Sequence, residues 1–301
     1  MKKSLSIAIA LASMTTASLA VAEIDLYGKA NVSLEMVNEG DVSTTELLSN
    51  ASRLGFKGSE KINDQLEAIY QLEYEVYFDD SETFKQRNIF IGLKGGFGQV
   101  IAGNFDTPLK VAQNKIDLFN DLRGDIKNVI TVNDNRTSNT VQYSTPETGG
   151  FGANLAVISS EVEGQDAGKS LSVSWANEMF YVAGAFEQDV EDENAEAMRA
   201  VAQINLNAVQ LGALYEQYEE ENQDSVDGWL VSAQFKVASD WALKAQYGQS
   251  DQHEEGGETM SIGADYKLSK NAKVFGFYTE ETADNDVLDN DYAGIGMELK
   301  F

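Results

Sequence analysis

Three aspartates, each four residues from the next, stand out in the stretch from Thr107 to Asn135. They are Asp117, Asp121 and Asp125. Residues four apart lie on one side of a helical turn, so we expect the three carboxylates to face the same direction. The spacing therefore predicts one acidic side on this stretch.

The stretch 107–135, called segment 107–135 below, does not itself alternate, although the residues on both sides alternate like β-strands. A loop of this length inside a compact β protein is usually functional or disordered. Its apolar residues, among them Leu109, Ile116 and Phe119, are numerous enough to pack. We predict that the chain builds a β-barrel pore, and that segment 107–135 folds into the pore and sets what passes.

Enzymatic chemistry finds little support in the sequence. The single histidine, His253, stands beside Glu254 and Glu255. A lipase or protease barrel needs an activated nucleophile with a positioned base, and these three residues do not make a convergent triad. We therefore predict that the protein is not an enzyme and carries no cofactor.

The acidic run Asp284–Asp291 resembles a calcium-binding loop in charge only. It lacks the glycine at the sixth position and the glutamate at the twelfth that such a loop requires. A solvated outer loop is the favoured interpretation, and no metal site is predicted. Weak bridging of acidic loops to anionic lipopolysaccharide by divalent ions stays open.

The N-terminus predicts export. Lys2 and Lys3 precede an apolar run over 5–19, and small residues at 20–22 offer a cleavage site, as in a secretory signal peptide. Residues 23–301 would form one domain. The full chain has a formal charge of −27, which argues against a nucleic-acid partner because such binding needs a basic surface. The absence of cysteine excludes disulfides.

Alternation of apolar and polar residues predicts the fold class. From Ile24 to Met36 every second residue is apolar or small, whereas the other face includes Lys29. From Gln65 to Phe78 the polar face carries acids, Glu73 among them. A soluble secreted β protein could not bury such acids without partners, and a charge facing lipid would cost roughly 2–4 kcal/mol. We predict an all-β, transmembrane antiparallel β-barrel of about sixteen strands.

Connections of alternating length predict the topology. Tight turns, such as 61–64, alternate with longer acidic stretches, such as 38–50 and 281–290. Short turns lie on the periplasmic side of bacterial barrels and longer loops outside. When the connections are assigned alternately to the two sides from the N-terminus, the short connection 79–82 is an outer loop. Segment 107–135 is then the third outer loop.

Several motifs in the right order resemble the general porins of the Gram-negative outer membrane. They are Ser52–Gly58 (SRLGFKG), Arg87–Leu93 (RNIFIGL), Gly95–Gly103 (GGFGQVIAG) and Asn139–Phe151 (NTVQYSTPETGGF), with Phe301 at the chain end. The resemblance covers the whole mature chain. It implies a sixteen-stranded trimeric diffusion pore whose third loop folds inward and faces arginines of the barrel wall.

The resemblance also implies which residues line the constriction. The wall arginines that match by motif position are Arg53, Arg87 and Arg136, and the matching loop acids are Asp117 and Asp121. Asp125 joins them by its spacing alone. Asn104 stands where the family often has arginine, and the second outer loop is short, so the latch onto a neighbouring subunit is missing.

The predicted function is a cation-preferring outer-membrane channel for passive diffusion of ions and small hydrophilic solutes. A substrate-specific porin, and an adhesin or receptor carried by the outer loops, are the alternatives. Expected partners are two further copies in a homotrimer, outer-membrane lipid and lipopolysaccharide, and the barrel-assembly machinery, which would recognise Phe301. Small outward-facing residues, namely Gly28, Ala30, Gly58 and Gly92, would allow close contact between subunits.

Overall fold

The computed structural model describes residues 23–80 and 84–301, so the predicted signal peptide and residues 81–82 of the joint 79–82 lie outside the described residues. The elements, in chain order, are β1 (Glu23–Glu39), β2 (Val42–Ser49), β3 (Arg53–Asn63), β4 (Leu66–Val76), β5 (Phe84–Gly95), β6 (Gly98–Asp106), α1 (Pro108–Ala112), η1 (Ile126–Asn128), β7 (Arg136–Ser144), β8 (Phe151–Ile158), β9 (Gly168–Ala176), β10 (Phe180–Gln188), β11 (Glu196–Leu206), β12 (Val209–Glu219), β13 (Val226–Lys236), β14 (Trp241–Ser250), β15 (Gly257–Lys267), β16 (Ala272–Thr282), η2 (Asp284–Asp286) and β17 (Asp289–Lys300). No helix in these described ranges is long and apolar enough to cross a bilayer.

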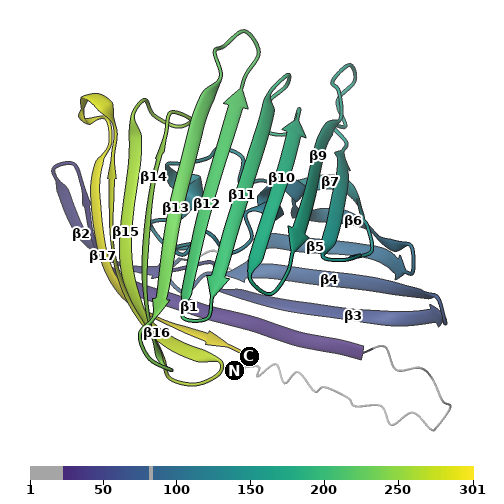
Figure 1. The fold of residues 1–301 in the computed structure, drawn as a ribbon, viewed down its shortest axis with the longest axis horizontal. Helices are drawn as coiled ribbons and strands as arrows, with labels where there is room; N and C mark the ends of the chain where they lie inside the picture. The colour runs from purple at the N-terminus through teal and green to yellow at the C-terminus, as the bar shows by residue number, and fades with distance from the viewer. Residues whose placement is uncertain (1–22, 81–83) are drawn as a thin grey trace, which may run out of the picture.

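Seventeen strand segments fill sixteen positions of a closed antiparallel barrel (Figure 1). One edge of the long strand β1 pairs with β3 in its first part and with β2 in its second. β2 and β3 therefore share one position of the wall, separated by a break at 50–52. The other edge of β1 pairs with β17, which closes the barrel. The predicted fold class and strand number are confirmed.

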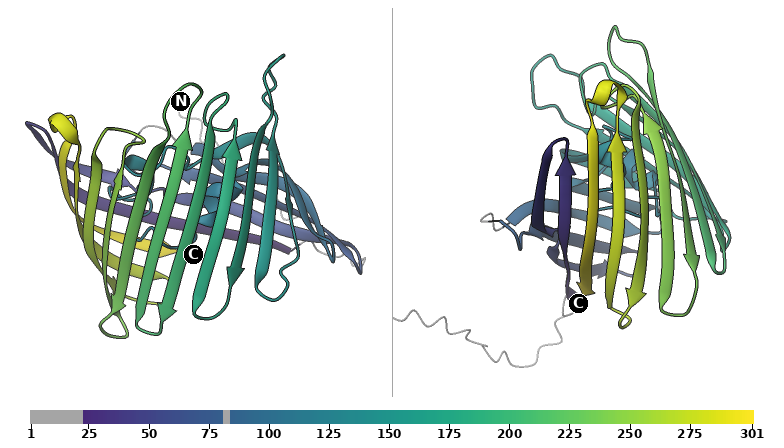
Figure 2. Two further views of the ribbon diagram at one scale, coloured as in Figure 1. Left: turned by 45° about the horizontal axis from the view of Figure 1, so that its top comes forward. Right: turned by 90° about the vertical axis from the view of Figure 1, so that its left-hand side faces the viewer.

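The longer connections gather at one rim and the short turns at the other (Figures 1 and 2). The loop predicted over 38–50 is wrong. β1 continues to Glu39, and a tight turn at Gly40 leads directly into β2. Gly40 has a φ of 54°, a left-handed conformation that glycine adopts without strain. The β-branched residues Val42, Thr44 and Thr45 favour the strand that follows.

Alternation along the strands separates an apolar outer face from a polar inner face. In β1 the side chain of Leu34 is 51% exposed, whereas that of the next residue, Glu35, is 1% exposed. The polar and charged side chains predicted for the inner face follow the same alternation. One placement is wrong: Gly92 does not face outward, because Ile91 beside it is exposed, and a Cβ at Gly92 would meet the buried side chain of Ile101.

The two ends of the barrel meet at Gly28 and Phe301. The Gly28 N–H donates to the Phe301 carbonyl at 2.9 Å, and the Phe301 N–H donates back at 3.1 Å. The last strand thus pairs with the strand that contains Ile24. The Phe301 ring lies where a Cβ of residue 28 would be, so the glycine makes room for the ring.

Candidate functional site

Segment 107–135 folds into short turns rather than one helix. The Thr107 hydroxyl accepts a hydrogen bond from the Lys110 N–H and caps α1, whose first residue is Pro108. Further along, Asp121 has a φ of 66°. This left-handed residue interrupts any helical spacing, so the expectation that all three aspartates face one direction is corrected.

One face of the segment packs against the inner face of β10–β13. Leu109, Ile116, Ile126 and Ile130 are fully buried there. Apart from Tyr218, the strand residues in the same apolar cluster are small or aliphatic: Ala183, Ala185, Ala197, Val201, Leu214 and Leu230. Burying a large aliphatic side chain contributes about 1.5–3 kcal/mol, so this contact is the apolar anchor of the segment.

Glycines of the neighbouring wall make room for the segment. A Cβ at Gly212 of β12 would lie 2.8 Å from Cγ2 of Ile116, and a Cβ at Gly248 of β14 would lie 2.7 Å from Cδ1 of Ile130. Both are closer than side-chain carbons approach in folded proteins. The two isoleucines therefore occupy space that any larger wall residue would fill.

A buried ion pair ties both ends of the segment to the same wall. Arg199 of β11 and Glu216 of β12 are 2.5 Å apart, and both side chains are 0% exposed. The Arg199 guanidinium also donates to the Leu109 carbonyl at 3.3 Å and to the Thr131 hydroxyl at 3.1 Å. The Asn133 side chain donates to Glu216 at 3.0 Å. The pair thus joins the beginning and the end of the segment.

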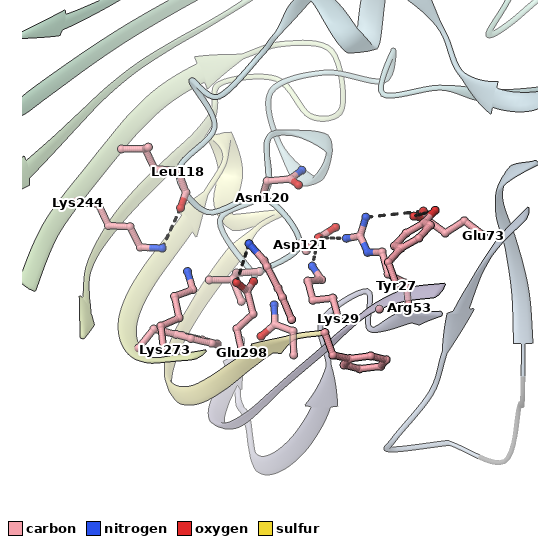
Figure 3. A pocket seen from close by; sticks show the side chains of 16 residues that line it. Tyr27, Lys29, Arg53, Glu73, Leu118, Asn120, Asp121, Lys244, Lys273 and Glu298 are labelled. Carbon is pink, nitrogen blue, oxygen red and sulfur yellow. Dashed lines mark hydrogen bonds and ion pairs between the residues drawn. The ribbon is translucent and has the colours of Figure 1, made fainter. Parts of the chain in front are cut away.

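On the opposite side, Asp121 reaches the wall near β1 and β3. Its carboxylate lies 2.7 Å from Lys29 Nζ and 2.7 Å from an Arg53 guanidinium nitrogen (Figure 3). Burial alone would raise the pKa of Asp121, but the cations Lys29 and Arg53 outweigh it and lower the pKa below its usual range. Of the predicted pairs between loop acids and wall arginines, the structure brings this one into contact.

The other two predicted arginines bond acids of the wall itself. Arg87 lies 2.9 Å from Glu73 and 3.1 Å from Glu75, and Arg136 lies 2.8 Å from Asp106. All three predicted arginines therefore lie on β3, β5 and β7, on one side of the barrel. That side is lined by paired charges.

Asp117 and Asp125 hold the segment's own backbone and do not contact the arginines. Asp117 accepts hydrogen bonds from the Phe119 N–H at 2.9 Å, the Ile126 N–H at 3.1 Å and the Gln246 amide at 3.1 Å. Burial raises the pKa of Asp117, and the nearby carboxylate of Asp125 adds to the rise. Asp125 accepts from the Asp121 N–H at 2.9 Å.

Arg123 contacts the barrel wall, which the sequence analysis did not predict. Its guanidinium lies 3.1 Å from Glu35 and 3.0 Å from Glu46, and it stacks 4.6 Å from the ring centroid of Tyr292. Lys29 was missed too, although it lies on the same polar face of its strand as the acids. The signal for Arg123 was slight, since it is merely the one arginine of the segment.

The remaining candidates lie at the outer end of the site. His253 Nε2 is 3.1 Å from the Thr131 carbonyl oxygen, so the lone histidine contacts the segment's end. Within 284–291, Asp284–Asp286 forms η2. Over the part of the chain that the structure describes, no group of three histidine, cysteine or acidic residues is placed to hold a metal ion.

Comparison with known proteins gives one consistent result. A family model described as Gram-negative porin matches residues 8–286. The major outer membrane protein P.IB of Neisseria lactamica is 30% identical, over 75% of this chain and 72% of that protein. P.IB of Neisseria meningitidis serogroup B is 27% identical over the full length of both chains.

Solved structures share the fold. The anion-selective porin from Comamonas acidovorans has a TM-score of 0.75 at 17% identity, covering 93% of this chain and all of that one. OmpF of Salmonella typhi in complex with daunomycin has a TM-score of 0.78 at 19% identity, covering 93% and 98%. At such identities the similarity concerns the barrel architecture.

Proposed function

Because this chain belongs to the Gram-negative porin family, whose members lie in the outer membrane, we propose that it is a passive channel for ions and small hydrophilic solutes. The observation that carries the proposal is the arrangement of segment 107–135. It contacts the polar inner faces of β1 and β3 through Asp121, and the inner faces of β10–β13 through its isoleucines. A segment that spans between two sides of a barrel narrows the passage.

Several charges at this narrowing are joined in ion pairs, and further lysines line the same cavity. Lys29, Arg53, Arg87 and Arg136 face Asp121, Glu73, Glu75 and Asp106 in direct ion pairs. Asp117 is withdrawn into the segment, so it adds no acid to the balance. These ion pairs by themselves therefore favour neither sign strongly.

We place the origin of cation preference at the outer mouth, where acidic residues crowd the connections 189–195 and 220–225. The field of exposed charges decays over about 8 Å at 0.15 M salt and about 3 Å at 1 M. The preference should therefore be clear in dilute salt and fade in concentrated salt.

The test is the zero-current potential across a potassium chloride gradient, measured in planar bilayers at low and high salt. We expect cation preference at low salt that weakens at high salt, and further weakening at low salt when the outer acids are neutralised. Selectivity for anions, the property named for the Comamonas neighbour, would overturn the proposed sign. A bilayer without conductance would overturn the channel itself.

A homotrimer is the proposed assembly. One of the similar solved structures, OmpT of Vibrio cholerae, is described in a trimer form. With its short second outer loop, this chain should form a trimer that dissociates at a lower temperature than those of latched relatives. Migration only as a monomer in mild detergent would contradict the proposal.

We propose that Phe301 is the signal for the barrel-assembly machinery and that the assembled barrel contacts lipopolysaccharide. The ring of Phe301 is 59% exposed on the outer face, at the seam between β1 and β17. Deletion of Phe301 should leave unassembled protein in the periplasm, which fractionation would detect. A normal yield of folded barrel would exclude the role.

A further inference from the structure

The outer half of the barrel wall has a notch beside β2. Within residues 23–80 and 84–301, β2 pairs with β1 along one edge and with no other strand. The next strand of the wall, β4, ends at Val76, whose N–H donates to the Ser52 carbonyl at 2.8 Å. Because β5 begins opposite Val76, no described strand runs beside the second edge of β2 (Figure 2, right).

This second edge of β2, called the free edge below, presents unpaired backbone groups. The Asn50 N–H donates to a β1 carbonyl at 2.8 Å, whereas the Ser49 N–H points the other way and donates to the Asp79 carboxylate at 2.7 Å. Backbone groups of an antiparallel strand alternate between its two edges. The residues that direct both N–H and C=O away from β1 are therefore Ser43, Thr45 and Leu47.

The notch extends from the rim to the middle of the wall. Ser49, at the end of β2, lies opposite Val32, near the midpoint of the 17-residue β1. The outward face of this hairpin is apolar, with Leu34 and Leu47 both exposed, so Leu47 lies at the depth of the lipid chains. Hydrocarbon cannot pair with N–H or C=O groups, and an open sheet edge is not tolerated there. The free edge therefore requires a protein partner.

The wall is incomplete beside the passage as long as the notch is open. A cavity of about 700 Å³ is lined by Ser49 and Ala51, at the inner corner of the notch, and also by Asp121 of segment 107–135. In addition, Glu46 of β2 lies 3.0 Å from Arg123 of the same segment. The notch thus adjoins the part of the barrel where the segment narrows the passage.

We propose that a second copy of this chain covers the free edge by adding an extended segment to it, and so completes the outer half of the wall. The inference rests on the homotrimer proposed above and assigns one surface of it. An added strand supplies the backbone partners that lipid lacks. Around a threefold axis unlike surfaces of two copies meet, so the added segment comes from a part of the second copy other than its own free edge.

The chain contains no cysteine, so Leu47→Cys creates a unique thiol at the free edge. A benzophenone maleimide is attached to this thiol, the purified protein is placed in lipid vesicles, and illumination links the benzophenone to the nearest C–H bonds. Mass measurement after denaturation identifies the products. We expect covalent pairs with twice the mass of one chain as the main product, because a second copy lies against Leu47.

Met198→Cys is the matched control. Met198 of β11 is 54% exposed and Leu47 is 52% exposed, and β11 lies across the barrel from β2 (Figure 2, right). The label at position 198 should give lipid adducts. If Leu47→Cys does not assemble, Thr45→Cys replaces it, because Thr45 lies on the same free edge.

The outcomes separate the inference from the proposals on which it rests. Pairs that form equally at positions 47 and 198 would overturn it, and so would a trimer whose label at position 47 yields products of single-chain mass alone. A conducting protein that migrates as a monomer would overturn the homotrimer together with the inference. Absence of conductance would overturn the channel alone, since the cross-link does not depend on ion flow.

Discussion

The inner faces of β3–β7 and of β10–β15 carry different side chains, although inward and outward residues alternate in the same way along both. The first face carries paired charges, such as Arg87 with Glu73, that stay partly accessible. The second carries mainly small and aliphatic residues around the buried Arg199–Glu216 pair, and Ile116 and Ile130 are completely buried against it. One side of the barrel offers charge to the passage, and the other side holds the segment in place.

The difference shows how a barrel can carry charged side chains on one inner face and still fix a long segment against another. The attraction within an ion pair is largely offset by the cost of removing its charges from water, whereas each buried aliphatic side chain contributes about 1.5–3 kcal/mol. The position of segment 107–135 is therefore set mainly by β10–β15. The charged side can then vary without displacing the segment.

The largest effect should come from breaking the buried pair on the holding side. Arg199→Ala leaves the buried Glu216 carboxylate without its cation, and breaking such a pair costs about 3–5 kcal/mol. Urea unfolding of the barrel in detergent measures the loss. The double variant Arg199→Met with Glu216→Leu should recover much of it, because no isolated charge remains. A single variant as stable as the wild type would contradict the role of the pair.

A smaller loss should follow from filling the space beneath Ile116. Gly212→Leu places side-chain atoms where Ile116 now lies, and overpacking of this kind costs about 1–3 kcal/mol. We expect a displaced segment, seen as altered and noisier single-channel conductance. Gly184→Leu is the control, since an added Cβ at Gly184 of β10 meets nothing within 4 Å. Equal conductance changes in both variants would argue against a specific contact.

On the charged side, selectivity should change while stability changes little. Asp121→Asn leaves Lys29 and Arg53 without their acid, so preference should move toward anions, roughly twofold in permeability ratio. Asp117→Asn should leave selectivity unchanged, because Asp117 bonds backbone N–H groups within the segment. Zero-current potentials compare the two variants. A shift in the Asp117 variant as large as that in the Asp121 variant would refute the distinction.

The smallest effect should appear on acidification. The pKa of Asp121 lies below its ordinary value of 3.8, so its ion pairs are intact above pH 3.8 and are lost as the pH falls below 3.8 through the lowered pKa. Channel closures recorded from about pH 5 to about pH 2 should increase in that lower window. Asp121→Asn should not show the transition. Closures that begin well above pH 3.8 would point to another group.

Much of the wall could be predicted from the sequence because a period of two is a local property. The placement of Leu34 outward and Glu35 inward follows from alternation alone, and so does the inward side of Glu73 and Arg53. The paired hairpin of β1 and β2 was missed because acidic, polar residues over 38–50 suggested a loop. β-Branched residues outweighed that signal.

The interior of segment 107–135 could not be predicted in the same way. Equal spacing made Asp117, Asp121 and Asp125 look equivalent, but a left-handed residue at 121 turns the chain and separates them. Which acid is buried depends on contacts with Gln246, more than a hundred residues away in the sequence. Likewise, the match between Ile116 and Gly212 is a matter of shape across the barrel.

The seam between β1 and β17 has a consequence for the order of folding. It joins Gly28 to Phe301, residues at opposite ends of the described chain, and contacts of such long sequence separation form slowly. Segment 107–135 touches β1 on one side of the barrel and β10–β13 on the other. We expect the seam to be the last contact made, so the segment has to be in place before the ends of the chain meet.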